Sequence, residues 1–233
     1  RCRPSTMTPF RPAFLVTALV LVAFAVPANA QFTEDLGRVR VARLQYAGGG
    51  DWYADPSSLP NFHAELTRRT GIPTVERAVA LTLDDERLYR YPLLYATGHG
   101  VIRPLPADVQ RLRRYLDAGG FLWVDDNYGI DTSFRQLVAD LYPDAELVPV
   151  GSDHPIYSSF YRLDGLPKIH EHDGDPAQGY GVFHEGRMAI FYSWSSDIGD
   201  GLEDPAVHDN SPEAREAALR MAVNVVVFAL TQP

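Results

Sequence analysis

Short apolar runs alternate with amphipathic segments between residues 39 and 143. VRVARLQY at 39–46 alternates apolar and polar positions and carries β-branched residues, which favours a strand. VERAVALTL at 75–83 predicts a second strand. YPLLYATGHG at 91–100 is a short apolar run into a glycine turn, which is typical of a buried parallel strand. FLWV at 121–124 predicts the next strand.

Three segments between these runs place apolar residues at helical spacing. The first, 59–70, is followed by Gly71, where the left-handed residue after a helix belongs. The second, 107–118, ends before Gly119 and Gly120. The third is predicted to start with Ser133 as its N-cap and to stop at Pro143. Their apolar stripes are Leu59, Phe62 and Leu66; Val109, Leu112 and Leu116; and Phe134, Leu137, Val138 and Leu141.

After about residue 150 the pattern changes to polar, aromatic, Pro- and Gly-rich stretches. GVFHEGRMAIFYS at 181–193 predicts a β-hairpin around Glu185–Gly186. A C-terminal helix is predicted with Ser211 as N-cap, Pro212 in the first turn and an end near Leu230. Residues 221–230 are apolar nearly all round, so we expect them to be buried, and they are too few to span a bilayer.

Alternating strands and helices with short glycine turns predict a doubly wound α/β fold with a mostly parallel sheet, a C-terminal β-hairpin and a final helix. In such folds, ligands bind beyond the carboxyl ends of the strands. Three predicted strands end in segments rich in glycine, carboxylate and aromatic residues. We therefore expect one site there, built from 48–53, 97–100 and 125–128.

The N-terminal residues predict export. Residues 7–30 combine a positive start at Arg11, an apolar stretch and a small-x-small cleavage site before Gln31, as in a secretory signal peptide. Residues 1–6 precede the first methionine and are expected to be upstream translation or the result of an alternative start, and residues 31–233 are expected to form a single α/β domain. The protein is then periplasmic or secreted in a bacterium; the alternative is an uncleaved N-terminal membrane anchor.

Charge and cysteine content narrow the function. The chain has a net charge of −9, and the predicted leader carries arginines but no acids, so the mature part is more acidic still. Such a chain repels nucleic acid, and we expect neutral ligands, cations or metal ions instead. The single cysteine is Cys2, within the predicted leader, so we expect no disulfide, zinc–thiolate site or cysteine nucleophile after cleavage.

Several ordered motifs resemble domain-of-unknown-function family 4159. They are ARLQYAGGGDWYADPSSLPNF, YPLLYATGHG, LRRYLDAGGFLWVDDNYG, HPIY, GLPKIHEHDG and SDIGDGLEDPAVH, spread over the whole predicted domain. The resemblance implies a flavodoxin-like fold similar to class I glutamine amidotransferases. Those folds often carry a nucleophilic cysteine on a tight strand-to-helix turn, where this chain has His99 or Asp125. The resemblance implies no particular reaction.

The stretch PKIHEHDGDP at 167–176 suggests a metal site. In an extended segment His170 and His172 share a face, and two imidazoles so placed can bind one cation. We expect further ligands from Asp126 or His154, with Asp125 as another candidate, and zinc, iron or manganese as the metal. The alternative is that both histidines only form hydrogen bonds in a polar loop.

Two residues are candidates for proton transfer. Asp125 and Asp126 follow an apolar strand and point to opposite sides, so at most one of them faces the site. We take Asp125 and His99 as the catalytic candidates, because a carboxylate or imidazole at a strand end can act as general base. The alternatives are a helix-capping role for the aspartate and a turn-fixing role for the histidine.

The remaining candidates surround the same strand ends. Asp51, Trp52, Tyr53 and Tyr128 are predicted to contact a small molecule, glycan or peptide. Gly48–Gly50 lacks the features of a nucleotide-binding loop, so a tight turn and no nucleotide cofactor are expected. SDIGDGLED at 196–204 is expected to be a solvated acidic loop, with calcium binding as the alternative.

Two functions fit these observations. The first is metal-assisted hydrolysis of an envelope or extracellular substrate. The second is a non-catalytic ligand-binding or envelope-complex module, with a neighbouring membrane protein as its partner. The fold alone does not separate them.

Overall fold

The computed structural model describes residues 37–75 and 77–233. They form one seven-stranded sheet in the order β2-β1-β3-β4-β7-β6-β5. The strands are β1 (Val41–Leu44), β2 (Val79–Leu81), β3 (Leu93–His99), β4 (Phe121–Tyr128), β5 (Val148–Pro149), β6 (Gln178–His184) and β7 (Arg187–Trp194). The first five in spatial order run parallel, whereas β6 is antiparallel to β7 and to β5. The predicted mostly parallel α/β sheet is confirmed.

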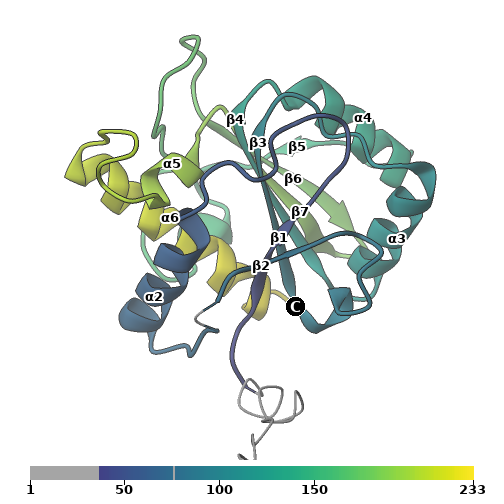
Figure 1. Ribbon diagram of the computed structural model, residues 1–233, viewed down its shortest axis with the longest axis horizontal. Helices are drawn as coiled ribbons and strands as arrows, with labels where there is room; N and C mark the ends of the chain where they lie inside the picture. The colour runs from purple at the N-terminus through teal and green to yellow at the C-terminus, as the bar shows by residue number, and fades with distance from the viewer. Residues whose placement is uncertain (1–36, 76) are drawn as a thin grey trace, which may run out of the picture. The chain divides into compact units, whose positions relative to one another are not determined.

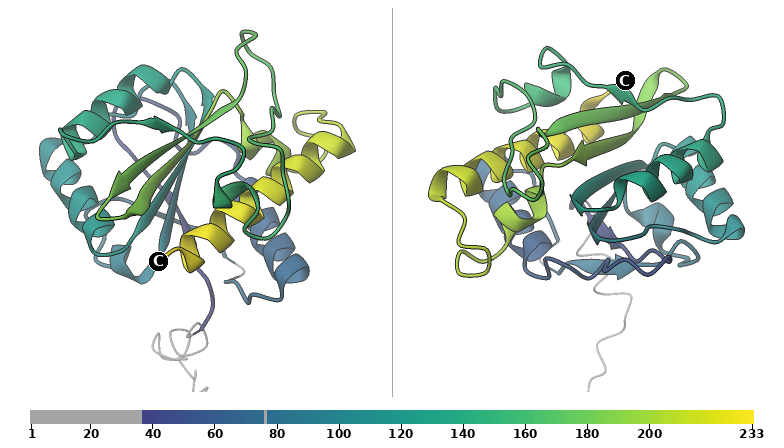
Figure 2. Two further views of the ribbon diagram at one scale, coloured as in Figure 1. Left: turned by 180° about the vertical axis from the view of Figure 1, so that it is seen from behind. Right: turned by 90° about the horizontal axis from the view of Figure 1, so that it is seen from above.

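Helices cover both faces of the sheet (Figures 1 and 2). On one face lie α3 (Pro106–Asp117) and α4 (Asp131–Leu141), packed over a core that includes Leu94, Leu122 and Phe134. On the other face lie α2 (Ser58–Thr70), α5 (Ile198–Leu202) and α6 (Pro212–Thr231). Two short 3-10 turns, η1 (Leu88–Arg90) and η2 (Pro155–Tyr157), complete the chain. The central strands are buried at successive positions, and because successive side chains point to opposite faces, these strands contribute to a core on each side of the sheet.

The parallel strands follow the flavodoxin-like order, with β1 between β2 and β3. The chain therefore passes from β1 to β2 on one side of β1 and then crosses to β3 on the other side. Such a reversal opens a crevice at the carboxyl ends of the two strands, where doubly wound proteins bind ligands. The carboxyl ends of β4 and β7 lie along the same edge, because both strands run parallel to β3.

The predicted hairpin and final helix are confirmed. Glu185 and Gly186 both adopt positive φ between β6 and β7, as a two-residue hairpin turn requires. Ser211 caps α6 by accepting a hydrogen bond from the Ala214 N–H, and Pro212 begins the helix. None of the described helices combines the length and the hydropathy of a membrane-spanning segment. The predicted signal peptide lies outside the described residues.

Some boundaries differ from the prediction. Strand β4 continues through Asp125 and Asp126 to Tyr128 instead of ending at Val124. Helix α4 begins at Asp131, so Ser133 is inside its first turn and is not the N-cap. The Ser133 hydroxyl donates to the Ile130 carbonyl and accepts from the Ile102 N–H. It joins the β3–α3 loop to α4, a tertiary contact that overrides the local capping pattern.

Candidate functional site

The carboxyl ends of β1, β3, β4 and β7 surround a cluster of carboxylates and histidines. The segment after β1 contributes Asp51 and Asp55, β3 ends in His99, and β4 supplies Asp125. Residues after β7 contribute the rest through α5 and the loops on either side of it, together with the 165–176 loop. The convergence of these strand ends, expected from the sequence, is present.

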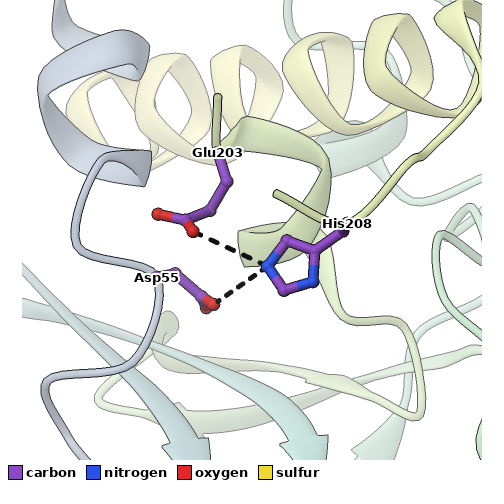
Figure 3. Close-up of side chains that lie close together, drawn as sticks. All are labelled: Asp55, Glu203 and His208. Atoms are coloured by element: carbon purple, nitrogen blue, oxygen red, sulfur yellow. Dashed lines mark ion pairs between the residues drawn. The ribbon is translucent and has the colours of Figure 1, made fainter. Parts of the chain in front are cut away.

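Asp55, Glu203 and His208 converge at the centre of the cluster (Figure 3). Asp55 lies in the loop before α2, Glu203 directly follows α5, and His208 lies in the loop between α5 and α6. His208 Nε2 faces Glu203 Oε2 at 3.6 Å and Asp55 Oδ1 at 4.0 Å. Both distances exceed hydrogen-bonding reach, and the buried Nε2 has no hydrogen-bond partner among the described residues. Three potential metal-ligating atoms therefore face one small space.

Each of the two carboxylates has one oxygen anchored and the other directed at His208. The anchored oxygen of Asp55, Oδ2, accepts from Asn127 Nδ2 at 3.0 Å and from Thr97 Oγ1 at 3.2 Å. Glu203 Oε1 accepts from the N–H and the hydroxyl of Ser57 at 2.7 and 2.8 Å. These bonds hold both side chains in place, so the two carboxylates are positioned before any ligand arrives.

Asp197 and Asp200 form a second group with Asp55. Asp197 immediately precedes α5 and Asp200 lies within it, and both are almost completely buried. Burial raises the pKa of both carboxyls, and their proximity to other carboxylates acts in the same direction. Asp197 Oδ1 is buried without a hydrogen-bond partner in the described structure. Leaving such an atom unpaired costs roughly 1–3 kcal/mol.

Histidines pair with these carboxylates toward the solvent side. His170 Nδ1 lies 3.2 Å from Asp200 Oδ2, and His172 Nε2 lies 3.1 Å from Asp197 Oδ2. The two rings are 4.8 Å apart, so the expected proximity of His170 and His172 is present, although their segment is an irregular loop and not a strand. Burial lowers the pKa of His172, and the neighbouring His170 adds to this effect.

His99 lies at the mouth of the cluster and is paired with Asp51. His99 Nδ1 is 3.1 Å from Asp51 Oδ2, and the His99 N–H donates to Asp51 Oδ1. The imidazole remains 46% exposed, and its ring lies 6.2 Å from that of His172. Asp51, predicted to contact substrate, thus orients His99 in this structure.

Asp125 lies beneath the cluster and is completely buried. Its carboxylate accepts from Ser193 Oγ at 2.5 Å, the Gly199 N–H at 2.7 Å and the Tyr95 hydroxyl at 3.3 Å. Burial raises the Asp125 pKa to about 7. Because Gly199 is in the first turn of α5, Asp125 holds the helix that carries Asp200.

The structure does not bring Asp126 and His154 to the same centre. Asp126 points to the opposite face of β4, where it accepts from the Tyr192 hydroxyl at 2.9 Å. His154 packs against Phe228 in the last turns of α6, whereas His208 precedes the first turn of that helix. Neither residue belongs to a group of metal-ligating side chains in the described chain.

The predicted aromatic residues are not equivalent. Tyr53 and Tyr128 are 65% and 51% exposed, and the Tyr128 ring lies 5.1 Å from that of His172. Trp52 is partly buried against the core beneath α3 and α4. Beside Tyr128 and His172 a pocket of about 260 Å³ opens, also lined by Asp126 and Trp194. This pocket can receive part of a ligand next to the cluster.

The expectation of a solvated acidic loop at 196–204 is wrong. Asp197, Asp200 and Glu203 are only 1%, 4% and 2% exposed, because α5 packs against α2 and α6 and turns the acids inward. The sequence pattern did not single out Asp55 and His208 as site residues. Asp55 and Asp197 both adopt positive φ, a conformation that aspartate tolerates better than most residues and that is enriched at functional sites.

No curated protein matches the chain. Residues 40–230 match the family described as a domain of unknown function (DUF4159). This match covers every strand and nearly all of the described chain, including the whole cluster. The chain belongs to that family.

Proposed function

We propose that this protein is an exported, metal-dependent hydrolase whose cation is held by Asp55, Glu203 and His208. The observation that carries the proposal is the buried, unpartnered His208 Nε2 facing two carboxylate oxygens. Atoms bound about 2.1 Å from one ion lie roughly 3–4 Å from each other, which is close to the spacing found here.

The opposite nitrogen of His208 supports this assignment. His208 Nδ1 lies 3.1 Å from Asp200 Oδ2. A proton on Nδ1 is stabilised by this carboxylate and leaves the lone pair of Nε2 free for a cation. Histidine ligands of metals generally have this arrangement, in which a carboxylate fixes the ring from behind.

Two carboxylate oxygens and one imidazole nitrogen form a set of ligands that suits manganese, iron or zinc. A cation in such a site polarises a substrate carbonyl or phosphoryl oxygen and lowers the pKa of water. His99, oriented by Asp51 and exposed at the mouth, has the position of the general base. Tyr128 and the neighbouring pocket would position the substrate.

This assignment replaces the ligand set predicted from the sequence. His170 and His172 remain close to the centre, but their nearest carboxylate partners are Asp200 and Asp197. They therefore act as outer groups that hold carboxylates in place. Asp125 is proposed to be a positioning residue, because its oxygens are occupied by buried donors.

The test is the metal content and activity of the purified protein. Wild-type protein should contain or tightly bind manganese, iron or zinc, and His208→Ala should lose it. His184→Ala is the matched control, because His184 pairs with Asp117 away from the cluster and its loss should leave the metal in place. Wild-type protein that binds none of the three metals would overturn the proposal.

The hydrolase activity needs its own assay. Metal-loaded protein should hydrolyse at least one of a panel of ester, phosphoester, peptide and glycan substrates, and a chelator should abolish the activity. His99→Gln should reduce turnover without reducing metal content. A metal-loaded protein that cleaves no member of the panel would favour the non-catalytic binding module.

Export is tested separately. Expressed with its own N-terminus in a bacterium, the protein should be recovered outside the cytoplasm with a new N-terminus at Gln31. A protein that keeps residues 7–30 would favour the uncleaved anchor.

A further inference from the structure

Asp55 belongs to both groups of metal-ligating side chains. One group is Asp55, Glu203 and His208, and the other is Asp55, Asp197 and Asp200. Within each group the ligand atoms lie within 4.8 Å of one another. A carboxylate oxygen has two lone pairs, so a carboxylate shared in this way can bridge two cations even though Asp55 Oδ2 accepts from Asn127 and Thr97.

Each group contains a buried polar atom that lacks a hydrogen-bond partner among the described residues. In one group it is His208 Nε2, and in the other it is Asp197 Oδ1. The Asp197 side chain is only 2% exposed, so solvent cannot easily satisfy it. A single cation at Asp55, Glu203 and His208 would leave Asp197 Oδ1 unpaired.

The His208 ring separates the two sets of carboxylates. Its Nδ1 faces Asp200 and its Nε2 faces Glu203. The two nitrogens of an imidazole point in different directions. A cation bound to Nε2 is therefore on the far side of the ring from the Asp200 oxygen that faces Nδ1. The two groups are therefore distinct positions that meet at Asp55.

Charge favours two divalent cations. Asp55, Asp197, Asp200 and Glu203 are all at most 5% exposed, and their ion-pair partners in the described structure are histidines. Arg43, which lies nearby, donates to the backbone carbonyls of Trp52, Ala54 and Asp55. Burial disfavours the charged form of these carboxyls, and two divalent cations would compensate the charge of all four when they are ionised.

We propose that the cluster holds a pair of divalent cations bridged by Asp55, the second one ligated by Asp197 and Asp200. This inference rests on the proposed function and extends it, because two-metal centres stabilise both the attacking and the leaving oxygen in hydrolysis. The substrate would then be an ester or a phosphoester, because in these the attacking and the leaving atoms are both oxygens.

The test is a Mn²⁺ titration of the full chain after removal of metal with a chelator. Wild-type protein should bind two equivalents and show the exchange-coupled electron paramagnetic resonance spectrum of a manganese pair. Asp197→Asn should bind one equivalent and show an uncoupled six-line spectrum. Asparagine tolerates the left-handed backbone of this position, so the loop should be preserved.

Two further variants complete the test. Asp204→Asn changes an exposed acid next to Glu203, and this variant should still bind two equivalents. If Asp197→Asn does not fold, Asp200→Asn replaces it with the same expected loss of one equivalent, because its amide oxygen can still accept from His208 Nδ1 and leave the first cation in place. The second cation is overturned if the wild-type protein binds one equivalent, if His208→Ala loses it and if Asp197→Asn retains it. This result leaves the proposed function standing. Binding of none overturns both.

Discussion

Asp125 and Asp126 are neighbours in β4, and their carboxylates lie on opposite faces of the sheet. Asp125 accepts from Ser193 and from the Gly199 N–H, beneath the cluster. Asp126 accepts from Tyr192 and from the Ile130 N–H, beneath the start of α4. The alternation of a strand thus directs one carboxylate to the candidate site and the other to a helix terminus.

Asparagine and alanine at position 125 should behave differently. In Asp125→Asn, the amide oxygen can still accept from Gly199 and the amide nitrogen can donate to Ser193, so Mn²⁺ affinity should change little. In Asp125→Ala the buried Gly199 N–H loses its acceptor, and Mn²⁺ affinity should fall by about 10–100-fold, as when a supporting partner of a ligand is lost. Calorimetric titration measures both.

Asp126→Asn is the control for that pair, because it alters the adjacent carboxylate on the other face. Its Mn²⁺ affinity should equal that of the wild type. Equal losses of affinity in Asp125→Asn and Asp125→Ala would show that the negative charge of Asp125 matters, and that its role is not positioning alone.

Gly199→Ala should block the site without removing a ligand. A methyl group at this position would overlap Asp55 Oδ2 and lie 2.9 Å from the Tyr95 hydroxyl. The backbone of Gly199 is not in the left-handed region, so the helix itself accepts alanine. We expect Mn²⁺ binding to be lost while far-ultraviolet circular dichroism is unchanged.

Gly201→Ala is the matched comparison on the same short helix. A methyl group there would overlap the Ala218 side chain of α6 and not a carboxylate. This variant should have a lower melting temperature than the wild type but should retain Mn²⁺ binding. The reverse ranking of the two variants would contradict the placement of the cluster on the Asp55 side of α5.

Asn224→Leu should destabilise the protein although it makes α6 more apolar. Asn224 is completely buried, accepts from the Phe160 and Tyr161 N–H groups and donates to the Tyr161 carbonyl. Each buried polar group left unpaired costs about 1–3 kcal/mol, so urea denaturation should show a loss of several kcal/mol. Val225→Leu, a buried apolar change in the same helix, should cost less.

Stability should fall with acidification through a buried histidine of α2. Burial lowers the pKa of His63 from 6.5 to about 4. Between pH 6.5 and pH 4 the unfolded chain therefore binds a proton at His63 that the folded chain does not. The free energy of unfolding has its full value above pH 6.5 and decreases as the pH falls toward 4. This pKa shift corresponds to a decrease of at most about 3 kcal/mol in the free energy of unfolding.

His63→Leu removes this proton linkage. Between pH 6.5 and pH 4 the free energy of unfolding of the variant should decrease less steeply than that of the wild type. Parallel curves for the two proteins over this range would show that the pKa of His63 is the same in the folded and the unfolded chain.

The sequence by itself determined the parallel strands of the first half, the C-terminal hairpin, the long helices and the edge of the sheet where polar residues gather, but not β5 or α5. Apolar periodicity reports which side of an element is buried, so β3, β4 and α6 were predictable from local pattern alone. The same reasoning identified His99, which lies at a predicted strand end, whereas His170 and His172 were identified by their His-x-His spacing.

Only the tertiary structure decided which acids are buried. Asp55, Glu203 and His208 lie in loops without periodicity, and the acidic run at 196–204 has the composition of an exposed loop. The packing of α5 against α2 and α6 turns that run inward and brings Glu203 to Ser57, far away in the sequence. Loop paths depend on such long-range contacts, and local sequence carries no signal for them.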